Sequence, residues 1–282
     1  MHETSPLLRA KAYDEPSVFE PANLLREGRR QRGRPDIAVP AVCLLDPDGD
    51  IVRHLTATGQ AHEHPGWACY HTTLWTFDLD GTEIGVIGCA VGASFAVLIA
   101  EQLAVSGCQQ LISITSSGSI TAVADPPYFV IIDRALRDEG TSHHYLPPGD
   151  WSHAPTRLLD RVRDIDGLTQ RLVVGPTWTT DAPYRETPTA IGQAETAGVI
   201  AVEMEAAAST PTPPLETAMC SASHTSPTRW PPTATTSRKA RPTAPTLRWN
   251  SSLPWSSGSD DVPGPKPASL RRAAAQGWVG LA

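Results

Sequence analysis

The sequence lacks the long apolar segment of a membrane protein. It contains nothing near the roughly 18 consecutive apolar residues that a membrane-crossing helix needs. Residues 1–17 include acidic side chains and no apolar core of the kind found in secretory signal peptides. An excess of positive charge is also missing, since the net charge is -7, whereas proteins that bind nucleic acids usually present a basic face. We therefore expect a cytoplasmic protein with a small-molecule partner, and neither a nucleic acid nor a membrane as a partner.

Paired cysteine spacings are missing as well. The chain has five cysteines, and no two of them form a CxxC motif. Most lie in or beside apolar runs, where a thiol behaves as a small buried apolar group. We therefore expect reduced thiols and no metal site. The cysteines are Cys43, Cys69, Cys89, Cys108 and Cys220.

The last quarter of the chain lacks the residues that build a core. Residues 209–282 contain no isoleucine, two valines and 12 of the 27 prolines, and they carry eight Lys/Arg against three Asp/Glu. Such a segment buries too little apolar surface to offset the entropy lost when its backbone is ordered. We therefore divide the chain into a polar N-terminal arm (1–36), an α/β domain (37–208) and a low-complexity, disordered tail (209–282).

Strands and helices alternate through the central part of the chain. Ile84 to Cys89 is a continuous apolar strand, and "ASFAVLIAEQLAVSG" follows it with helical spacing of its apolar residues. Further strands end in polar loops in "LISITSSGSI", "LVVGPTWTTDAPYRE" and "VIAVEMEAAA". This alternation predicts a three-layer α/β/α fold with a central mixed, largely parallel sheet that is incomplete at the C-terminus. Ligands of such sheets bind at the carboxyl ends of the strands.

The loop "GCAVGAS" joins a buried strand to the start of a helix. Gly92 permits close approach of a ligand, and Ser94 is expected to cap the helix, whose N-terminus favours an anion. The loop is neither GxGxxG nor a P-loop, so we do not expect it to bind a dinucleotide or a triphosphate. It is not GxSxG either, which excludes Ser94 as an elbow nucleophile. The alternative is that the glycines serve packing alone.

Two acidic residues, Glu203 and Glu205, flank Met204 directly after the strand "VIAV". A carboxylate at the end of a strand can accept both hydrogen bonds of a sugar diol. The alternative is an exposed helix N-terminus, where acidic residues are favoured by the helix dipole.

Taken together, "GVIGCAVGASFAVLIAEQL", "LISITSSGSI" and "VIAVEMEAAA" resemble the nucleoside phosphorylase family, over residues 37–208. That family includes uridine and purine nucleoside phosphorylases and the related nucleosidases. The resemblance implies cleavage of the N-glycosidic bond of a nucleoside through an oxocarbenium-like transition state, with release of the base and ribose 1-phosphate. It also implies phosphate as a possible co-substrate, no other cofactor, and a homo-oligomer for an intact member.

The resemblance also implies roles for individual residues. Met204 would pack on the ribose, Glu205 would hold its hydroxyl groups, and Glu203 would lie near the base or the sugar. Ser116 matches a hydroxyl residue at the junction of phosphate and ribose. The implied catalytic residues are Glu205 and Asp181, the substrate-binding residues are Met204, Glu203, Ser116, Ser117, Gly118, Tyr184, Arg185 and His144, and the anion loop contains Gly92 and Ser94.

The chain departs from the family at the phosphate-binding arginines. The matching positions are Gly49, Tyr70 and Ser113, none of which is charged. Arg53 and the basic run 26–34 are the remaining candidates for binding phosphate, which Arg holds strongly through charge-assisted hydrogen bonds. Hydrolysis by water is therefore a rival to phosphorolysis. The base is unassigned, because the family's Gln-x-Arg base clamp is missing too.

The family pattern stops at Ala208. One interpretation of residues 209–282 is a natural low-complexity extension. The other is translation out of frame, because in the shifted frame the codons from Ser209 can spell Leu-Tyr-Ala-Tyr-Ala-Ala, which suits a helix after "EMEAAA". We favour the frameshift, from which we expect a marginally folded, poorly active chain. An inactive remnant of the family is thus a further alternative.

Overall fold

The computed structural model describes residues 5–9, 11–125, 127–163, 171–209 and 215–223. Of the expected tail, it describes residue 209 and residues 215–223 only. The expectation of disorder from residue 224 onward therefore lies outside the described residues, and so does most of the segment assigned to the frameshift.

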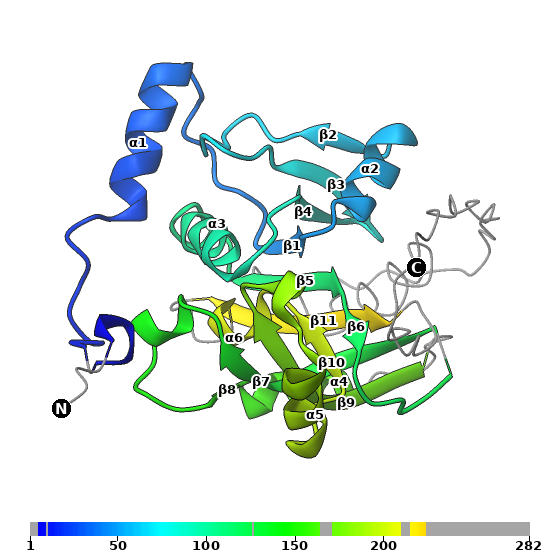
Figure 1. Ribbon diagram of the computed structural model, residues 1–282. Helices are drawn as coiled ribbons and strands as arrows, with labels where there is room; N and C mark the ends of the chain where they lie inside the picture. The colour runs from blue at the N-terminus through cyan, green and yellow to red at the C-terminus, as the bar shows by residue number, and fades with distance from the viewer. Residues whose placement is uncertain (1–4, 10, 126, 164–170, 210–214, 224–282) are drawn as a thin grey trace.

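The described strands join in one mixed sheet with the order β2-β3-β4-β1-β5-β11-β7-β9-β10-β6, and β8 pairs with β7 (Figure 1). Parallel pairs lie at its centre, as β1 pairs with β4 and β5, and β7 with β9. The predicted mixed α/β sheet is confirmed. The strands are β1 (Val42–Asp46), β2 (Ala61–Glu63), β3 (Trp75–Leu79), β4 (Thr82–Gly88), β5 (Gln110–Ser116), β6 (Gly118–Ser119), β7 (Tyr128–Asp138), β8 (Trp151–His153), β9 (Arg171–Thr180), β10 (Ala201–Glu203) and β11 (Glu216–Ser223).

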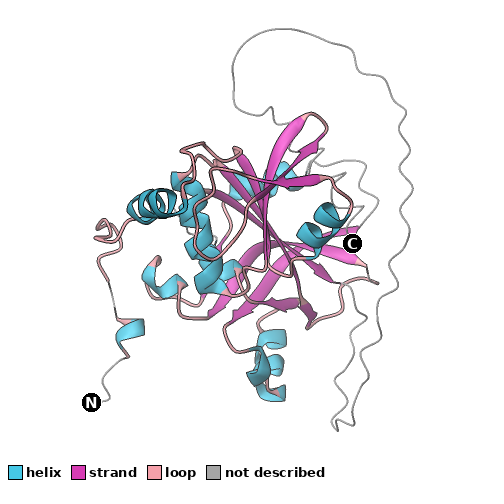
Figure 2. Cartoon of the chain, turned by 90° about the horizontal axis from the view of Figure 1, so that it is seen from above, coloured by secondary structure: helices cyan, strands magenta, loops and turns pink. Residues whose placement is uncertain are grey.

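Helices cover both faces of the sheet (Figure 2). On one face α3 packs on β1, β4 and β5 through Ile99 and Leu103, and on the other face α2 packs through Ile51 and Leu55. These contacts make the three predicted layers. The helices are α1 (Pro21–Arg32), α2 (Asp50–Ala57), α3 (Ala93–Val105), α4 (Thr156–Arg163), α5 (Pro188–Thr196) and α6 (Ala206–Ser209), with 3-10 turns η1 (Pro6–Leu8), η2 (Ser142–His144) and η3 (Pro183–Arg185).

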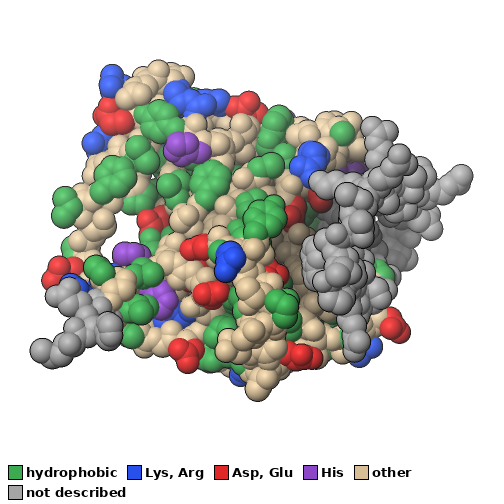
Figure 3. All heavy atoms as spheres, in the orientation of Figure 1, with side chains coloured by type: hydrophobic (Ala, Val, Ile, Leu, Met, Phe, Trp, Pro, Cys, Tyr) green, Lys and Arg blue, Asp and Glu red, His purple; other side chains and the backbone are tan. Residues whose placement is uncertain are grey.

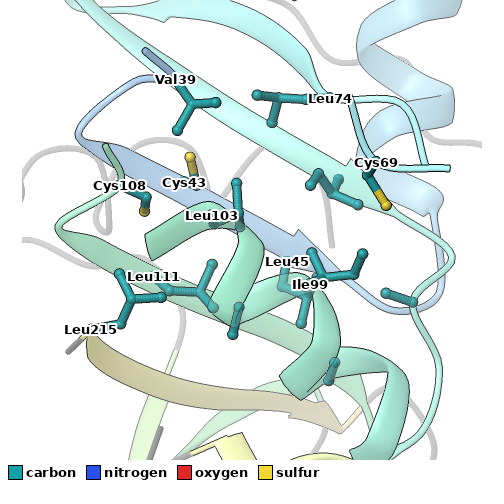
Figure 4. Packing of buried hydrophobic residues seen from close by; sticks show 14 of the residues in the cluster. Val39, Cys43, Leu45, Cys69, Leu74, Ile99, Leu103, Cys108, Leu111 and Leu215 are labelled. Atoms are coloured by element: carbon teal, nitrogen blue, oxygen red, sulfur yellow. The ribbon is translucent and has the colours of Figure 1, made fainter. Parts of the chain in front are cut away.

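The core beneath α3 consists mainly of buried aliphatic side chains from the first half of the expected domain. Leu45 of β1 and Leu111 of β5 pack against Ile99 and Leu103 of α3 (Figure 4). Cys43 and Cys108 belong to the same cluster and are free thiols, as expected. Cys89 differs, because it is exposed.

The sheet closes back on itself beyond β5. Strand β6 directly continues β5 and pairs antiparallel with β10, so that Gly118 lies opposite Val202. A Cβ atom on Gly118 would come within 2.9 Å of the Val202 side chain, which explains the glycine at this close approach. The closure brings the end of β5 to the end of β10, although the path between them through β11, β7 and β9 reverses strand direction once.

Residues 216–223 form a strand where the sequence analysis expected a coreless tail. Strand β11 lies between β5, to which it is parallel, and β7, to which it is antiparallel. Its Met219 and Cys220 are buried. The expectation that no core strand follows residue 208 is wrong here, because Met219, Cys220 and small side chains fill a central position without any valine or isoleucine.

The N-terminal arm is partly packed. Helix α1 buries Leu25 and lies against α3. Two arginines of the basic run bind groups of the α/β domain: Arg34 pairs with Glu63, and Arg32 donates to the Cys69 carbonyl. Residues 14–20 are exposed and connect α1 to η1, and Figure 3 shows an opening between this connection and the body.

None of the helices in the described ranges is long and apolar enough to cross a membrane. The described residues also contain no cluster of His, Cys, Asp and Glu that could hold a metal ion.

Candidate active site

Glu205 lies at the N-terminus of α3, although it is 113 positions away in the sequence from Gly92, the residue before that helix. The backbone N–H of Gly92, the residue before the helix, donates to Glu205 Oε1 at 2.7 Å. Gly92 has φ of 92°, a conformation that glycine adopts readily. A carboxylate is stabilised at such a helix end by the free N–H groups and the helix dipole. The anion held by the predicted loop is therefore the side chain of Glu205.

Ser94 does not cap this helix. The helix begins at Ala93, and no side chain caps its N-terminus. Ser94 is already the second helical residue and is exposed. The expected capping role is wrong, because Gly92 takes the cap position and Ser94 is already within the helix.

Glu203 is bonded on both carboxylate oxygens to the protein itself. Its Oε1 accepts hydrogen bonds from Thr177 and Thr179 at 3.1 and 2.5 Å. Its Oε2 accepts from the backbone N–H groups of Glu205 and Ala206, both at 2.7 Å. Glu203 therefore fixes the turn that carries Glu205, whereas the sequence analysis expected it to face the base or the sugar.

Thr179 extends this network into α6. Its hydroxyl donates to Glu203 and accepts from the backbone N–H of Ala207 at 2.9 Å. Strand β9 is thus tied to the first turn of α6, in addition to its pairing with β10. Met204, between the two buried glutamates, is partly exposed.

Both glutamates have raised pKa values. The pKa of Glu205 is raised to about 7, mainly by burial and in addition by the negative charge of Glu203, while the Gly92 N–H and the Thr115 side chain act in the opposite direction. Burial likewise raises the pKa of Glu203, against the hydrogen bonds that favour its ionised form. Glu205 Oε2 is buried and has no hydrogen-bond partner among the described residues. A buried carboxylate oxygen without a hydrogen-bond partner is unusual in a folded protein and marks a candidate for binding or catalysis.

Ionisation of Glu205 is expected to lower the stability of the fold as pH rises. Because its folded pKa is about 7 and the ordinary value is 4.5, the folded chain binds this proton more tightly than the unfolded chain. The stabilisation of the fold by this bound proton is complete below pH about 4.5 and is lost by pH about 7. The free energy of unfolding should change by about 3 kcal/mol over that range. Urea unfolding at several pH values would measure it, with Glu205→Gln as the comparison. Identical pH profiles for the two proteins would contradict this prediction.

Asp46, at the end of β1, joins the loop after β1 to the loop that precedes α3. Asp46 Oδ1 accepts from the Gly49 N–H and Oδ2 from the Val52 N–H, both at 3.0 Å, and its carbonyl accepts from the Cys89 N–H at 2.9 Å. Burial raises the pKa of Asp46 to about 6, and the two N–H groups oppose that rise. Asp46 therefore holds the turn "DPDGD" against the loop that leads to Gly92.

Asp48 occupies the hydrogen-bonding groups at the end of β5. Its Oδ2 accepts from the backbone N–H of Ser116 at 2.6 Å, and its Oδ1 accepts from the Ser116 hydroxyl at 3.0 Å. Arg53 donates to the Asp48 carbonyl and pairs with Asp50. Ser116, expected to face phosphate, thus already binds a carboxylate.

The positions matching the phosphate-binding arginines offer no cation in the structure. A side chain at Gly49 would lie 2.5 Å from the Cys89 sulfur, and the backbone there has φ of 76°. Ser113 is completely buried, and Tyr70 donates its hydroxyl to Gln31.

The expected catalytic residue Asp181 and the expected substrate-binding residues Tyr184 and Arg185 follow β9. Asp181 Oδ2 accepts from the Gly140 N–H at 2.9 Å, which joins this loop to the segment after β7. Tyr184 is fully exposed, and Arg185 is exposed as well, both in η3. His144 is exposed at the end of η2. Ser117 lies beside the β6–β10 closure and is partly buried.

Sequence reasoning missed three residues of the site region. Asp48 and Thr179 were not singled out, because their partners are far away in the sequence. Arg137 was not singled out either, and it is buried at the end of β7. A buried arginine is unusual unless it is paired or hydrogen-bonded, but the sequence alone did not show that it is buried.

Comparison with known proteins identifies the family. The model of the phosphorylase superfamily matches residues 42–209, which is more than half of the chain. The chain belongs to the phosphorylase superfamily. This confirms the resemblance, and the match ends within one residue of the expected boundary at residue 208.

A curated relative of this chain is distant in sequence. A guanosine phosphorylase from Halorubrum lacusprofundi is 28% identical over 132 residues, which cover 45% of this chain and 54% of that protein. The chain therefore matches about half the length of this curated relative.

Solved structures share the fold. Uridine phosphorylase from Vibrio fischeri ES114 superposes with a TM-score of 0.58 at 17% identity, over 66% of this chain and 81% of that one. The same enzyme in complex with 6-hydroxy-1-naphthoic acid gives 0.57 at 18% identity, over 66% and 78% of the two chains. At these identities the superposition establishes the fold alone.

Proposed function

We propose that this chain cleaves the N-glycosidic bond of a nucleoside. The observation that carries the proposal is the carboxylate of Glu205, which is buried, fixed by the Gly92 N–H, and free on Oε2 among the described residues. An oxygen in this state can accept hydrogen bonds from the hydroxyl groups of a ribose. Membership of the phosphorylase superfamily supports a nucleoside as the ligand.

Catalysis would rest on electrostatics and positioning. As the bond to the base breaks, positive charge develops on the sugar, and the ionised Glu205 stabilises it in a site of low dielectric constant. Met204 would pack on the ribose. Asp181, Tyr184 and Arg185 are the candidates for the base, and Asp181 is the candidate for protonating it as it departs. Relatives include a guanosine and a uridine phosphorylase, so both purine and pyrimidine nucleosides are worth testing.

The acceptor of the sugar is phosphate in phosphorolysis and water in hydrolysis. The superfamily favours phosphate, which would yield ribose 1-phosphate. The loop around Ser116 favours water, because the Asp48 carboxylate takes the N–H and the hydroxyl that would bind an anion. Arg53 of α2, which donates to the Asp48 carbonyl, is paired with Asp50. We therefore place hydrolysis before phosphorolysis. In hydrolysis, the water oxygen bonds to the anomeric carbon, its proton is released, and the base leaves with the electrons of the glycosidic bond.

The test is release of base from guanosine and from uridine, each with and without inorganic phosphate. We expect release that phosphate does not accelerate, with free ribose as the second product. Phosphate-dependent release of ribose 1-phosphate would instead establish phosphorolysis. A cooperatively folded chain that releases no base under either condition would be the inactive remnant.

Removal of the negative charge of Asp48 is expected to let phosphate bind near Ser116. In Asp48→Asn the negative charge is lost while the shape is kept, so phosphate should begin to bind and to alter the rate, by about tenfold at millimolar concentration. Asp80→Asn, in the exposed hairpin turn between β3 and β4, is the matched control and should leave the phosphate response unchanged. An unaltered response in Asp48→Asn would show that this carboxylate does not exclude phosphate.

A further inference from the structure

Strand β11 carries buried hydroxyl groups that no described residue binds. Thr217 and Ser221 are almost completely buried. Their hydroxyl oxygens have no hydrogen-bond partner among the described residues. Such a group is unusual, because burial of a hydroxyl without a hydrogen bond costs free energy. Ordered water is a common partner of buried polar groups that the protein itself leaves unbound.

The pairing of β11 with β5 places Ser221 beside Thr115. The two strands are parallel, and Ser221 lies opposite Thr115 in their register. Residues opposite one another in neighbouring strands point to the same face of a sheet, as do alternate residues of one strand. Met219, two positions before Ser221, packs against Ala206 and Ala207 of α6. Ser221 and Thr115 therefore point to the face that α6 covers.

Thr115 connects this face to Glu205. Its side chain lies against the Glu205 carboxylate and lowers the pKa of that group. Oε2 of the carboxylate is buried and has no hydrogen-bond partner among the described residues. Neighbouring strands are about 4.8 Å apart, and two hydrogen bonds through one water span about 5.5 Å. One water can therefore join the Ser221 hydroxyl to the carboxylate.

The side chains around this position are short. Ala206 follows Glu205, Ala93 follows Gly92, and both are completely buried. Ser113, the next residue of β5 on the same face, is also completely buried, and its hydroxyl has no partner in the described part of the chain. Short side chains and several unbound polar atoms together favour an interior water, which needs two to four polar partners.

We infer that Ser221 is a positioning residue that holds an ordered water against Oε2 of Glu205. The Ser221 hydroxyl donates to the water oxygen, and the water donates to Oε2. A carboxylate oxygen accepts more than one hydrogen bond, so a ribose hydroxyl can bind the same oxygen. The water site is independent of the proposed function, whereas its effect on base release rests on that function.

Nuclear magnetic resonance detects the water directly. With 13C-labelled threonine methyl groups in the full chain, we expect a cross-peak between the Thr115 methyl group and a water that stays bound longer than surface water. Thr115→Ser removes the methyl group and assigns its signal. Ser221→Ala should lose the cross-peak. Thr217→Val, on the same strand and face, is the matched control and should keep it. Absence of the cross-peak in the wild type, or its persistence in Ser221→Ala, would overturn the inference.

The ionisation of Glu205 gives a second measurement. A water that donates to Oε2 stabilises the ionised carboxylate. Ser221→Ala should therefore raise the pKa of Glu205 from its value of about 7 by about half a pH unit. The 13C resonance of the carboxyl group, assigned with Glu205→Gln, measures this change. Equal pKa values in the wild type and Ser221→Ala, or an equal rise in Thr217→Val, would also overturn the inference.

Ser221→Ala leaves the charges around Glu205 unchanged. The charge of Glu203 raises the pKa of Glu205, and the N–H groups of Gly92 and Met204 lower it. The elements that contact α6 carry the other acidic and basic groups to be considered. In the described side chains these are Glu101 on α3, Asp133, Arg134, Arg137 and Asp138 on β7, His143 and His144 on η2, His153 on β8 and Arg171 on β9.

Base release separates this inference from the proposed function. The pH at which base release rises should move upward in Ser221→Ala by the same amount as the pKa of Glu205. If the pKa moves and this pH does not, Glu205 does not control base release. If the wild type releases no base, the proposed function fails, while the two resonance measurements still decide whether Ser221 holds the water.

Discussion

Replacement of Glu205 by Gln is expected to lower kcat/KM for base release at least about 100-fold. The amide keeps an oxygen for the Gly92 N–H, which Glu205 Oε1 accepts at 2.7 Å, so the local structure should persist. What is lost is the negative charge that faces the developing cation, and one acceptor for the ribose hydroxyls. The measurement is steady-state base release from guanosine and uridine at pH 8, where the wild-type carboxylate, with a pKa of about 7, is ionised.

The matched control is Glu195→Gln on the exposed face of α5, which should leave base release unchanged. Wild-type activity should rise with pH through about 7, as Glu205 ionises, and this rise should be absent from the residual activity of Glu205→Gln. Unchanged turnover in Glu205→Gln would remove this residue from the active site. Circular dichroism and thermal unfolding of the variant separate loss of chemistry from loss of fold.

Replacement of Glu203 by Ala is expected to cost about 3–5 kcal/mol of stability. Its carboxylate accepts hydrogen bonds from two threonine hydroxyls and two backbone N–H groups. Because all four donors are buried around the β9–β10–α6 junction, removal of the acceptor leaves them without a partner and creates a cavity. Denaturant unfolding followed by circular dichroism measures the change in the free energy of unfolding.

Thr177→Val provides a milder change with which the loss of stability in Glu203→Ala can be compared. It removes one donor at 3.1 Å and leaves the other three, so it should cost about 1 kcal/mol. Glu203→Ala should also abolish activity, because it releases the turn that carries Glu205. A Glu203→Ala chain that unfolds at the wild-type denaturant concentration would show that the network does not support the fold.

Local pattern was sufficient to predict much of the fold. The strand at Ile84 and the helix after Gly92 follow from their own apolar spacing, and both appear with bounds close to the expected ones. Strand β11 could not be predicted in the same way. Its side chains are small and partly polar, and they are stabilised by neighbours on β5 and β7 that are distant in the sequence.

The candidate site, too, could be predicted from the sequence only in part. The motif "EMEAAA" identified Glu203, Met204 and Glu205 together, but the sequence could not assign different roles to the two glutamates. In the structure Glu203 is bonded to the protein on both oxygens, whereas Glu205 has a free one. The difference depends on the threonines of β9, which pairs with β10, and on Gly92 at the start of α3, and both are distant from the motif in the sequence.

By itself, the sequence determined the family, the mixed α/β class and the position of the acidic motif, because these depend on local spacing and on residue types that are adjacent in the chain. The tertiary structure decided which polar groups meet. It placed Asp48 on Ser116, Glu205 on the N-terminus of α3, and Arg137 on His143. Hydrogen bonds and charge interactions act over a few ångströms in space, so pairs that are 68 or 113 residues apart in sequence can be assigned only once the chain is folded.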